Sequence, residues 1–173
     1  MNEFKETQWF NRWFMLLTLL IPLGIMLYCI YAWYIQGVGV DKVPVDDYAG
    51  QALVLGLLGF TCLFMFSLQL HSKIDQDGIH YRYLPFILRW RKLSWYDIES
   101  CELKTYAPIS DYGGWGIKKS WNAKPAHWSY TISGNQGLFI VLRSGKSLLL
   151  GTRKAAEAER VVQYYLKKRT HES

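Results

Sequence analysis

The longest uncharged run of the chain, Trp13–Ile35, sets the strongest limit on its fold. It holds about 23 residues and contains no Asp, Glu, Lys, Arg or His. As a helix that rises about 1.5 Å per residue it would extend roughly 35 Å, which exceeds the roughly 30 Å hydrocarbon core of a bilayer. A second uncharged run covers Ala52–Leu70. We therefore predict a hairpin of two transmembrane helices within residues 1–71.

The first run is not typical of a cleaved signal peptide. It is longer than the apolar core of such a leader, and no small-x-small cleavage site follows it. The segment before it is mixed in charge instead of basic: Glu3, Lys5, Glu6 and Arg12. Neither run contains an ionisable side chain, whereas transporters and proton relays need such groups inside the membrane. We therefore expect a permanent anchor that has no transport role.

The charges that flank the two runs predict an orientation. The short connection Gln36–Ala49 carries three Asp and one Lys. Basic residues follow the second run: Lys73, Arg82, Arg89, Arg91 and Lys92. From Ser72 onward, 17 Lys and Arg stand against 9 Asp and Glu. Because Lys and Arg beside a span are retained on the cytoplasmic side, both termini should be cytoplasmic and the connection should lie outside.

The three cysteines do not form the pattern of a disulfide framework. Cys29 and Cys62 lie in the apolar part of the chain, and Cys101 lies in a predicted strand. We expect all three to be reduced, which suits a cytosolic domain.

Residues 72–173 have the periodicity of a small α+β domain. Ile79, Tyr81 and Tyr83 alternate with polar residues, as in a strand with one buried face. Similar segments, separated by turns, predict about seven strands. Near the end of the sequence Thr152 is a suitable N-cap for a helix over Arg153–Arg169. The predicted buried stripe of this helix is Ala158, Val161, Val162, Tyr165 and Leu166.

Several segments resemble successive strands of bacterial pleckstrin-homology-like (PH-like) domains: Gln76–Arg82 (QDGIHYR), Trp95–Ser100 (WYDIES), Tyr112–Ile117 (YGGWGI) and Gly145–Thr152 (GKSLLLGT). Such domains often follow two membrane helices, so the resemblance extends to the layout of nearly the whole chain. It implies a membrane hairpin followed by a partly open β-barrel with a C-terminal helix. It also implies a binding or scaffolding module of the bacterial cytoplasmic membrane, without catalytic residues and with a generally unknown ligand.

Basic and aromatic side chains form the candidate lipid or partner surface: Arg89, Arg91, Lys92, Tyr112, Trp115, Lys118, Lys119 and Lys124. Anionic lipids attract each nearby Lys or Arg by about 1 kcal/mol, so a tethered domain needs only weak contacts. The same charges are equally consistent with a solvated positive face. The loop Asp111–Trp121 and the open edge of the barrel are the expected contact sites, because exposed loops on a rigid scaffold often carry function.

Two glycine-containing segments raise the question of phosphate binding. Gly145–Ser147 resembles the end of a P-loop, but Ile140 stands where that motif needs Gly, and the segment joins two predicted strands. Gly113–Gly116, followed by Lys118 and Lys119, could cradle a phosphate through backbone N–H groups. A close-packed loop would explain the same glycines.

Other chemistries have less support. The four histidines lack metal-ligand spacing, so we expect no metal or other cofactor, and no nucleic-acid-binding motif is present. We predict a non-enzymatic module that contacts a protein partner, an anionic lipid or another copy of itself. The alternative is an enzyme acting on a lipid-linked or phosphorylated substrate at the inner leaflet. A deep cleft would favour that alternative if it held two or more of the acids Asp97, Glu99, Glu102 and Asp111.

Overall fold

The computed structural model describes residues 3–10, 12–120 and 127–172 and divides the chain into two compact units. One unit, the helical unit, is Phe10–Ser67. The other, the β unit, joins the short segment before Phe10 to the chain from Leu68 onward. The predicted boundary between residues 71 and 72 therefore differs from the observed one, because the first strand of the chain belongs to the β unit.

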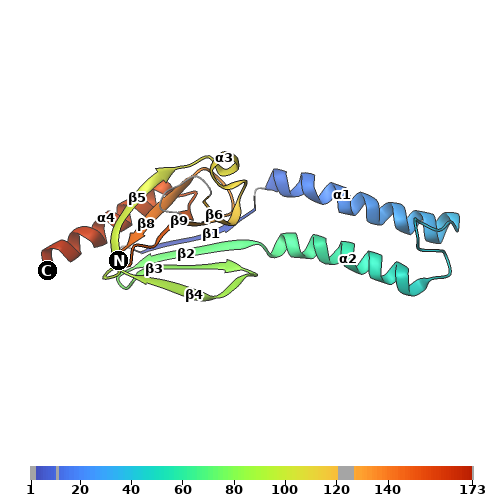
Figure 1. Cartoon of the computed structure of the whole chain (residues 1–173), viewed down its shortest axis with the longest axis horizontal. Helices are drawn as coiled ribbons and strands as arrows, with labels where there is room; N and C mark the ends of the chain where they lie inside the picture. Colours follow the sequence, from blue (N-terminus) through green and yellow to red (C-terminus); the bar gives the residue numbers. More distant parts are fainter. Residues whose placement is uncertain (1–2, 11, 121–126, 173) are drawn as a thin grey trace. The chain divides into compact units, whose positions relative to one another are not determined.

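The helical unit consists of two helices that pack side by side (Figure 1). Helix α1 spans Arg12–Ile30 and continues as a π-helical turn, η1, over Tyr31–Gln36. Helix α2 spans Tyr48–Ser67. Two stretches, Met15–Gln36 and Tyr48–Ser67, are long and apolar enough to cross a membrane, and only 17% and 6% of their apolar windows are buried. Apolar helices this exposed need an apolar surrounding to cover them.

Hydrogen bonds order the connection between α1 and α2. Asp47 caps α2, since its Oδ1 accepts the backbone N–H of Gly50 at 2.9 Å. The side chain of Gln51 is buried and donates through Nε2 to the carbonyl oxygen of Val45 at 2.8 Å. The predicted acidic connection is therefore a structured turn.

The first sheet of the β unit is antiparallel, with strands in the order β1 (Phe4–Trp9), β2 (Gln69–Asp75), β3 (Gly78–Leu84) and β4 (Ile87–Ser94). Strand β1 was not predicted from the sequence, yet it pairs with β2 along its whole length, with Trp9 opposite Gln69. The predicted inward face of β3 is confirmed, because Ile79, Tyr81 and Tyr83 are all buried.

The second sheet has its strands in the order β5 (Ile98–Thr105), β8 (Gln136–Leu142), β9 (Ser147–Gly151), β7 (Trp128–Thr131) and β6 (Gly116–Lys119). Neighbours are antiparallel except β7 and β9, which are parallel. A short helix, α3 (Pro108–Tyr112), follows β5 in the sequence. The described residues thus form an α+β fold with nine strands, where about seven were predicted, and the two sheets do not close into a barrel.

The C-terminal helix α4 (Ala155–Glu172) joins the two sheets. It packs against β1 and β2 of the first sheet and against β5 and β8 of the second. Its predicted stripe is confirmed at Ala158, Val161 and Val162, which are at most 3% exposed. The helix therefore supplies apolar surface that both sheets share.

Strand β1 holds the N-terminus of α4. The carboxylate of Glu6 accepts hydrogen bonds from the Thr152 hydroxyl at 2.7 Å and from the backbone N–H of Arg153 at 3.0 Å. Thr152, the predicted cap, also accepts the N–H of Lys154 at 3.1 Å, although the helix begins only at Ala155. A carboxylate is favourable here because the N-terminus of a helix carries partial positive charge.

Candidate functional site

The basic candidates lie on the edge strands of the two sheets. Arg89, Arg91 and Lys92 belong to β4, and Lys118 and Lys119 belong to β6. Successive side chains of a strand point to opposite faces, so Arg91 and Lys92 face different surroundings. The structure therefore distributes these charges over several surfaces.

The loop predicted as a contact surface is partly buried. Tyr112 is only 5% exposed and lines a pocket. The indole N–H of Trp115 donates to the carbonyl oxygen of Gly134 at 2.8 Å, which fastens the loop to the turn before β8. Trp121 and the candidate Lys124 lie outside the described residues.

The glycines after α3 terminate that helix. Gly113 adopts φ 68°, and its N–H donates to the carbonyl oxygen of Ile109 at 2.8 Å. The N–H of Gly114 donates to the carbonyl oxygen of Pro108, also at 2.8 Å. Because these two N–H groups are engaged, the phosphate-cradle interpretation loses the donors that it requires. The other glycine segment, Gly145–Ser147, joins β8 to β9, as predicted.

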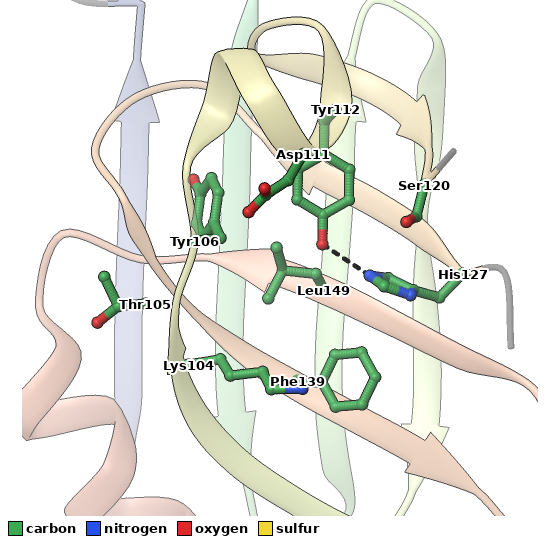
Figure 2. Close-up of a pocket in the computed structure, with 9 residues that line it drawn as sticks. All are labelled: Lys104, Thr105, Tyr106, Asp111, Tyr112, Ser120, His127, Phe139 and Leu149. Atoms are coloured by element: carbon green, nitrogen blue, oxygen red, sulfur yellow. Dashed lines mark hydrogen bonds between the residues drawn. The ribbon is translucent and has the colours of Figure 1, made fainter. Parts of the chain in front are cut away.

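One hollow of the β unit has a volume of about 300 Å³. We name it the aromatic pocket, and Figure 2 shows the side chains that line it: Lys104, Thr105, Tyr106, Asp111, Tyr112, Ser120, His127, Phe139 and Leu149. The Tyr112 hydroxyl and Nε2 of His127 form a hydrogen bond of 2.6 Å, and both side chains are buried. The imidazole of His127 also meets the ring of Phe139 edge to face, with centroids 5.0 Å apart. Three elements, α3, β8 and the start of β7, thus converge on one aromatic wall.

The ionisable groups of the aromatic pocket suit recognition. Burial raises the pKa of Tyr106 to about 12, and burial together with the nearby Asp111 carboxylate raises the pKa of Tyr112. Both phenols are therefore neutral at physiological pH and available for hydrogen bonding. Nζ of Lys104 lies 4.1 Å from the ring centroid of Phe139, which keeps one cation at the pocket. The pocket thus combines aromatic walls with several hydrogen-bonding and charged groups.

A wider hollow, about 580 Å³, lies where β3 and β4 of one sheet face strands β6 to β9 of the other. We name it the seam groove, and its lining consists of Tyr81, Ile87, Arg91, Leu93, Ile117, Trp128, Tyr130, Leu142, Lys146, Ser147 and Leu148. Most of these side chains are apolar or aromatic. The seam groove is therefore a mainly apolar hollow between the two sheets.

The charged side chains that line the seam groove are both positive. Arg91 and Lys146 are exposed cations, and the described lining contains neither Asp nor Glu. Burial raises the pKa of Tyr81 to about 12, an effect that Tyr130 reinforces and Arg91 opposes. The hydroxyl of Ser147 is buried and has no hydrogen-bond partner among the described residues. The groove therefore offers positive charge and no negative charge among its described lining residues.

Two smaller hollows of the β unit each include a carboxylate. One, of about 280 Å³, contains Lys92 and Asp77 beside Trp95. The other, of about 250 Å³, contains Glu6 beside Trp90. Of the four hollows, only the seam groove has Lys or Arg but neither Asp nor Glu among its described lining residues.

The acids on which an enzymatic interpretation depended are dispersed. Asp97 lies in the turn before β5, and Glu99 and Glu102 are exposed on β5. Asp111 lines the aromatic pocket. None of the four hollows contains two of these acids, so the geometry that would favour an acid–base enzyme is missing from them.

Lys104 was not singled out from the sequence, and Lys146 and Ser147 were considered only as part of the rejected P-loop segment Gly145–Ser147. His127 was considered only as a metal ligand, and its hydrogen bond to Tyr112 depends on α3, which was not predicted. Lys146 had a local signal, because a glycine turn places it at the tip of a hairpin. The sequence does not indicate that it would line the same groove as Arg91.

Comparison with protein families assigns the chain. Residues 2–160 match a family of unknown function, DUF6141. The chain belongs to the DUF6141 family. The DUF6141 match begins before β1 and ends inside α4, so it includes the apolar helices and both sheets. No curated protein matches the chain.

Proposed function

We propose that this DUF6141 protein is a membrane-anchored, non-enzymatic binding protein whose β unit is a PH-like domain at the cytoplasmic face of the membrane. One observation carries the proposal: two helices with largely exposed apolar surfaces interrupt the strand pair β1–β2. Since β1 leads into α1 and α2 leads into β2, the bilayer would hold the β unit through two covalent connections.

The strand order supports the PH-like assignment. Without the hairpin β6–β7, which is inserted between β5 and β8, seven strands remain. They form one antiparallel sheet in the order β1-β2-β3-β4 and another in the order β5-β8-β9, followed by α4. The resemblance implied about seven strands within residues 72–173, and its segment Tyr112–Ile117 reaches into β6, whereas β1 lies outside that range. The support for the proposal is therefore the coarser likeness of two facing sheets followed by a C-terminal helix.

The hollows support a binding role. Small-molecule sites are concave, mainly apolar, and roughly 300 to 1,000 Å³ in volume. The aromatic pocket and the seam groove, at about 300 and 580 Å³, agree with that description. The proposed function is therefore recognition, with the basic β unit on the side of the membrane where Lys and Arg are retained.

Cysteine labelling in intact cells tests the anchoring and the orientation. Asp46, in the connection, and Tyr96, in the β unit, are exposed. A membrane-impermeant maleimide should label an Asp46→Cys variant in intact cells, but label Tyr96→Cys only after permeabilisation. The unsubstituted chain, with Cys29, Cys62 and Cys101, is the control. Equal labelling of both variants in intact cells, or recovery of the protein in the aqueous fraction, would contradict the proposal.

A further inference from the structure

We propose that the seam groove binds a long-chain fatty acid drawn from the membrane, with the acyl chain between the two sheets and the carboxylate at Arg91 and Lys146. This inference rests on the proposed function, because a protein at a bilayer meets fatty acids at high local concentration. It names the class of ligand that the binding module takes.

The walls of the groove suit one acyl chain. Strand β4 supplies Ile87 and Leu93 on one side, and strands β6, β8 and β9 supply Ile117, Leu142 and Leu148 on the other. Burying apolar surface of a ligand is worth roughly 25 cal/mol for each Å² removed from water, so a linear hydrocarbon gains along its whole length. A volume of about 580 Å³ is within the range of single-ligand sites.

The charges of the groove select an anion. Arg91 and Lys146 are exposed, so the charged end of the ligand would lie at the mouth of the groove, where water remains available. A guanidinium presents a fork of donors that matches a carboxylate. The described lining offers no carboxylate that would compete for these cations.

An unused hydroxyl lies next to one of these cations. Ser147 follows Lys146 directly, is 8% exposed, and its Oγ has no hydrogen-bond partner among the described residues. Because successive side chains of β9 point to opposite faces, the Ser147 hydroxyl shares the face of Leu149, which lines the aromatic pocket, and not that of Leu148, which lines the groove. The anionic head would therefore be held by the two cations and not by this hydroxyl.

The other hollows fit this ligand less well. The aromatic pocket has about half the volume and contains Asp111. The two smaller hollows contain Asp77 and Glu6. A carboxylate in the lining repels an anionic head, so the seam groove is the site that the charge pattern favours.

Photolabelling of the full chain in phosphatidylcholine nanodiscs tests the proposal. The probe is palmitate with a diazirine near the end of its chain, and labelled peptides are mapped by mass spectrometry. Labels should fall on the peptides that contain Leu93, Ile117 or Leu148. Unlabelled palmitate should compete, whereas methyl palmitate, which lacks the charge, and inorganic phosphate, which lacks the chain, should not.

Paired variants identify the role of the charges. Arg91→Gln combined with Lys146→Gln should lower labelling of the groove roughly tenfold, since hydrogen bonds to charged groups are lost. The matched control is Arg89→Gln combined with Arg143→Gln. These two cations are exposed and lie in β4 and in the β8–β9 hairpin, as Arg91 and Lys146 do, but they do not line the seam groove. The control variant should be labelled as strongly as the native chain. Circular dichroism of both variants checks that they are folded.

Three results would overturn the inference: no label in the groove peptides, equal competition by methyl palmitate, or equal labelling of the two double variants. Failure of the proposed function looks different. If cysteine labelling contradicts the membrane orientation while palmitate still labels the groove, the ligand assignment stands and the anchoring does not.

Discussion

At the scale of single residues, Asp75 at the end of β2 shows how one buried carboxylate orders a turn. Its Oδ2 lies 2.7 Å from Nζ of Lys73, and its Oδ1 accepts the backbone N–H of Asp77 at 2.9 Å and lies 3.1 Å from Nε2 of His80. Burial alone would raise the pKa of Asp75, but the hydrogen bonds from Lys73 and Asp77 outweigh it, so the pKa lies below its ordinary value.

This residue makes the stability of the β unit depend on pH. Because the pKa of Asp75 is lower in the folded state, its stabilisation is present above the unfolded value near 4 and is lost as the pH falls through the folded value. We expect Asp75→Asn to lower the free energy of unfolding by about 2 kcal/mol at pH 7, and by less below about pH 4. Thermal unfolding followed between pH 3 and 7 measures this.

The control for this prediction is Asp77→Asn, which changes an exposed carboxylate in the same turn and keeps its backbone N–H. Its unfolding should match that of the native chain within about 0.5 kcal/mol. A constant difference between Asp75→Asn and the native chain over the whole pH range would contradict the prediction.

At the scale of elements, the sequence predicted those strands and helices whose apolar period is visible locally. Strand β3 and the stripe of α4 are of this kind, because Ile79, Tyr81 and Val161 follow periods of two and of three to four residues. Strand β1 buries Glu6 and Gln8, so its inward face looks like a solvated segment. The hydrogen-bond partners of Gln8 and Glu6, Gly151 and Thr152, lie more than 140 residues later in the sequence, so the local pattern around β1 does not predict these contacts.

The hollows could not be predicted from local sequence patterns either. Arg91 was a candidate because it is basic, and Lys146 was considered only within the rejected P-loop segment Gly145–Ser147. Their common groove exists because the two sheets face each other without closing, which depends on the pairing of strands that are distant in sequence. Residue type could therefore be predicted, whereas the grouping of residues into one site could not.

The link between β1 and α4 leads to a second prediction. In Glu6→Ala, the Thr152 hydroxyl and the backbone N–H of Arg153 lose their acceptor, which should destabilise the β unit by about 2 kcal/mol. Hydrogen exchange at Arg153 and the first turn of α4 should accelerate more than exchange in β3. The matched control is Lys5→Ala on the exposed face of β1, whose ion pair with Glu3 is superficial and should contribute little. Equal effects of the two substitutions would contradict the role assigned to Glu6.

At the scale of the whole molecule, the helical unit is an insertion into an otherwise continuous sheet. Trp9 and Gln69 are directly opposite each other at the end of the antiparallel β1–β2 pair. A two-residue Asn-Gly turn connects strands in this arrangement, so it could replace residues 10–68 without changing the register. We expect the resulting protein to be soluble and folded, with one cooperative thermal transition, because the β unit is a compact unit of its own.

The comparison is a chain that starts at Ser72, the boundary suggested by the sequence. It lacks β1 and the first part of β2. Helix α4 would lose the contacts that it makes with these strands, and the backbone N–H of Arg153 would lose its acceptor Glu6. We expect it to aggregate or to show no cooperative transition, since edge pairing and buried apolar surface are lost together. Size-exclusion chromatography and circular dichroism of the two proteins decide the question. If the chain from Ser72 folds as well as the Asn-Gly-linked one, β1 is dispensable, and the view of the helical hairpin as an insertion between two essential strands is wrong.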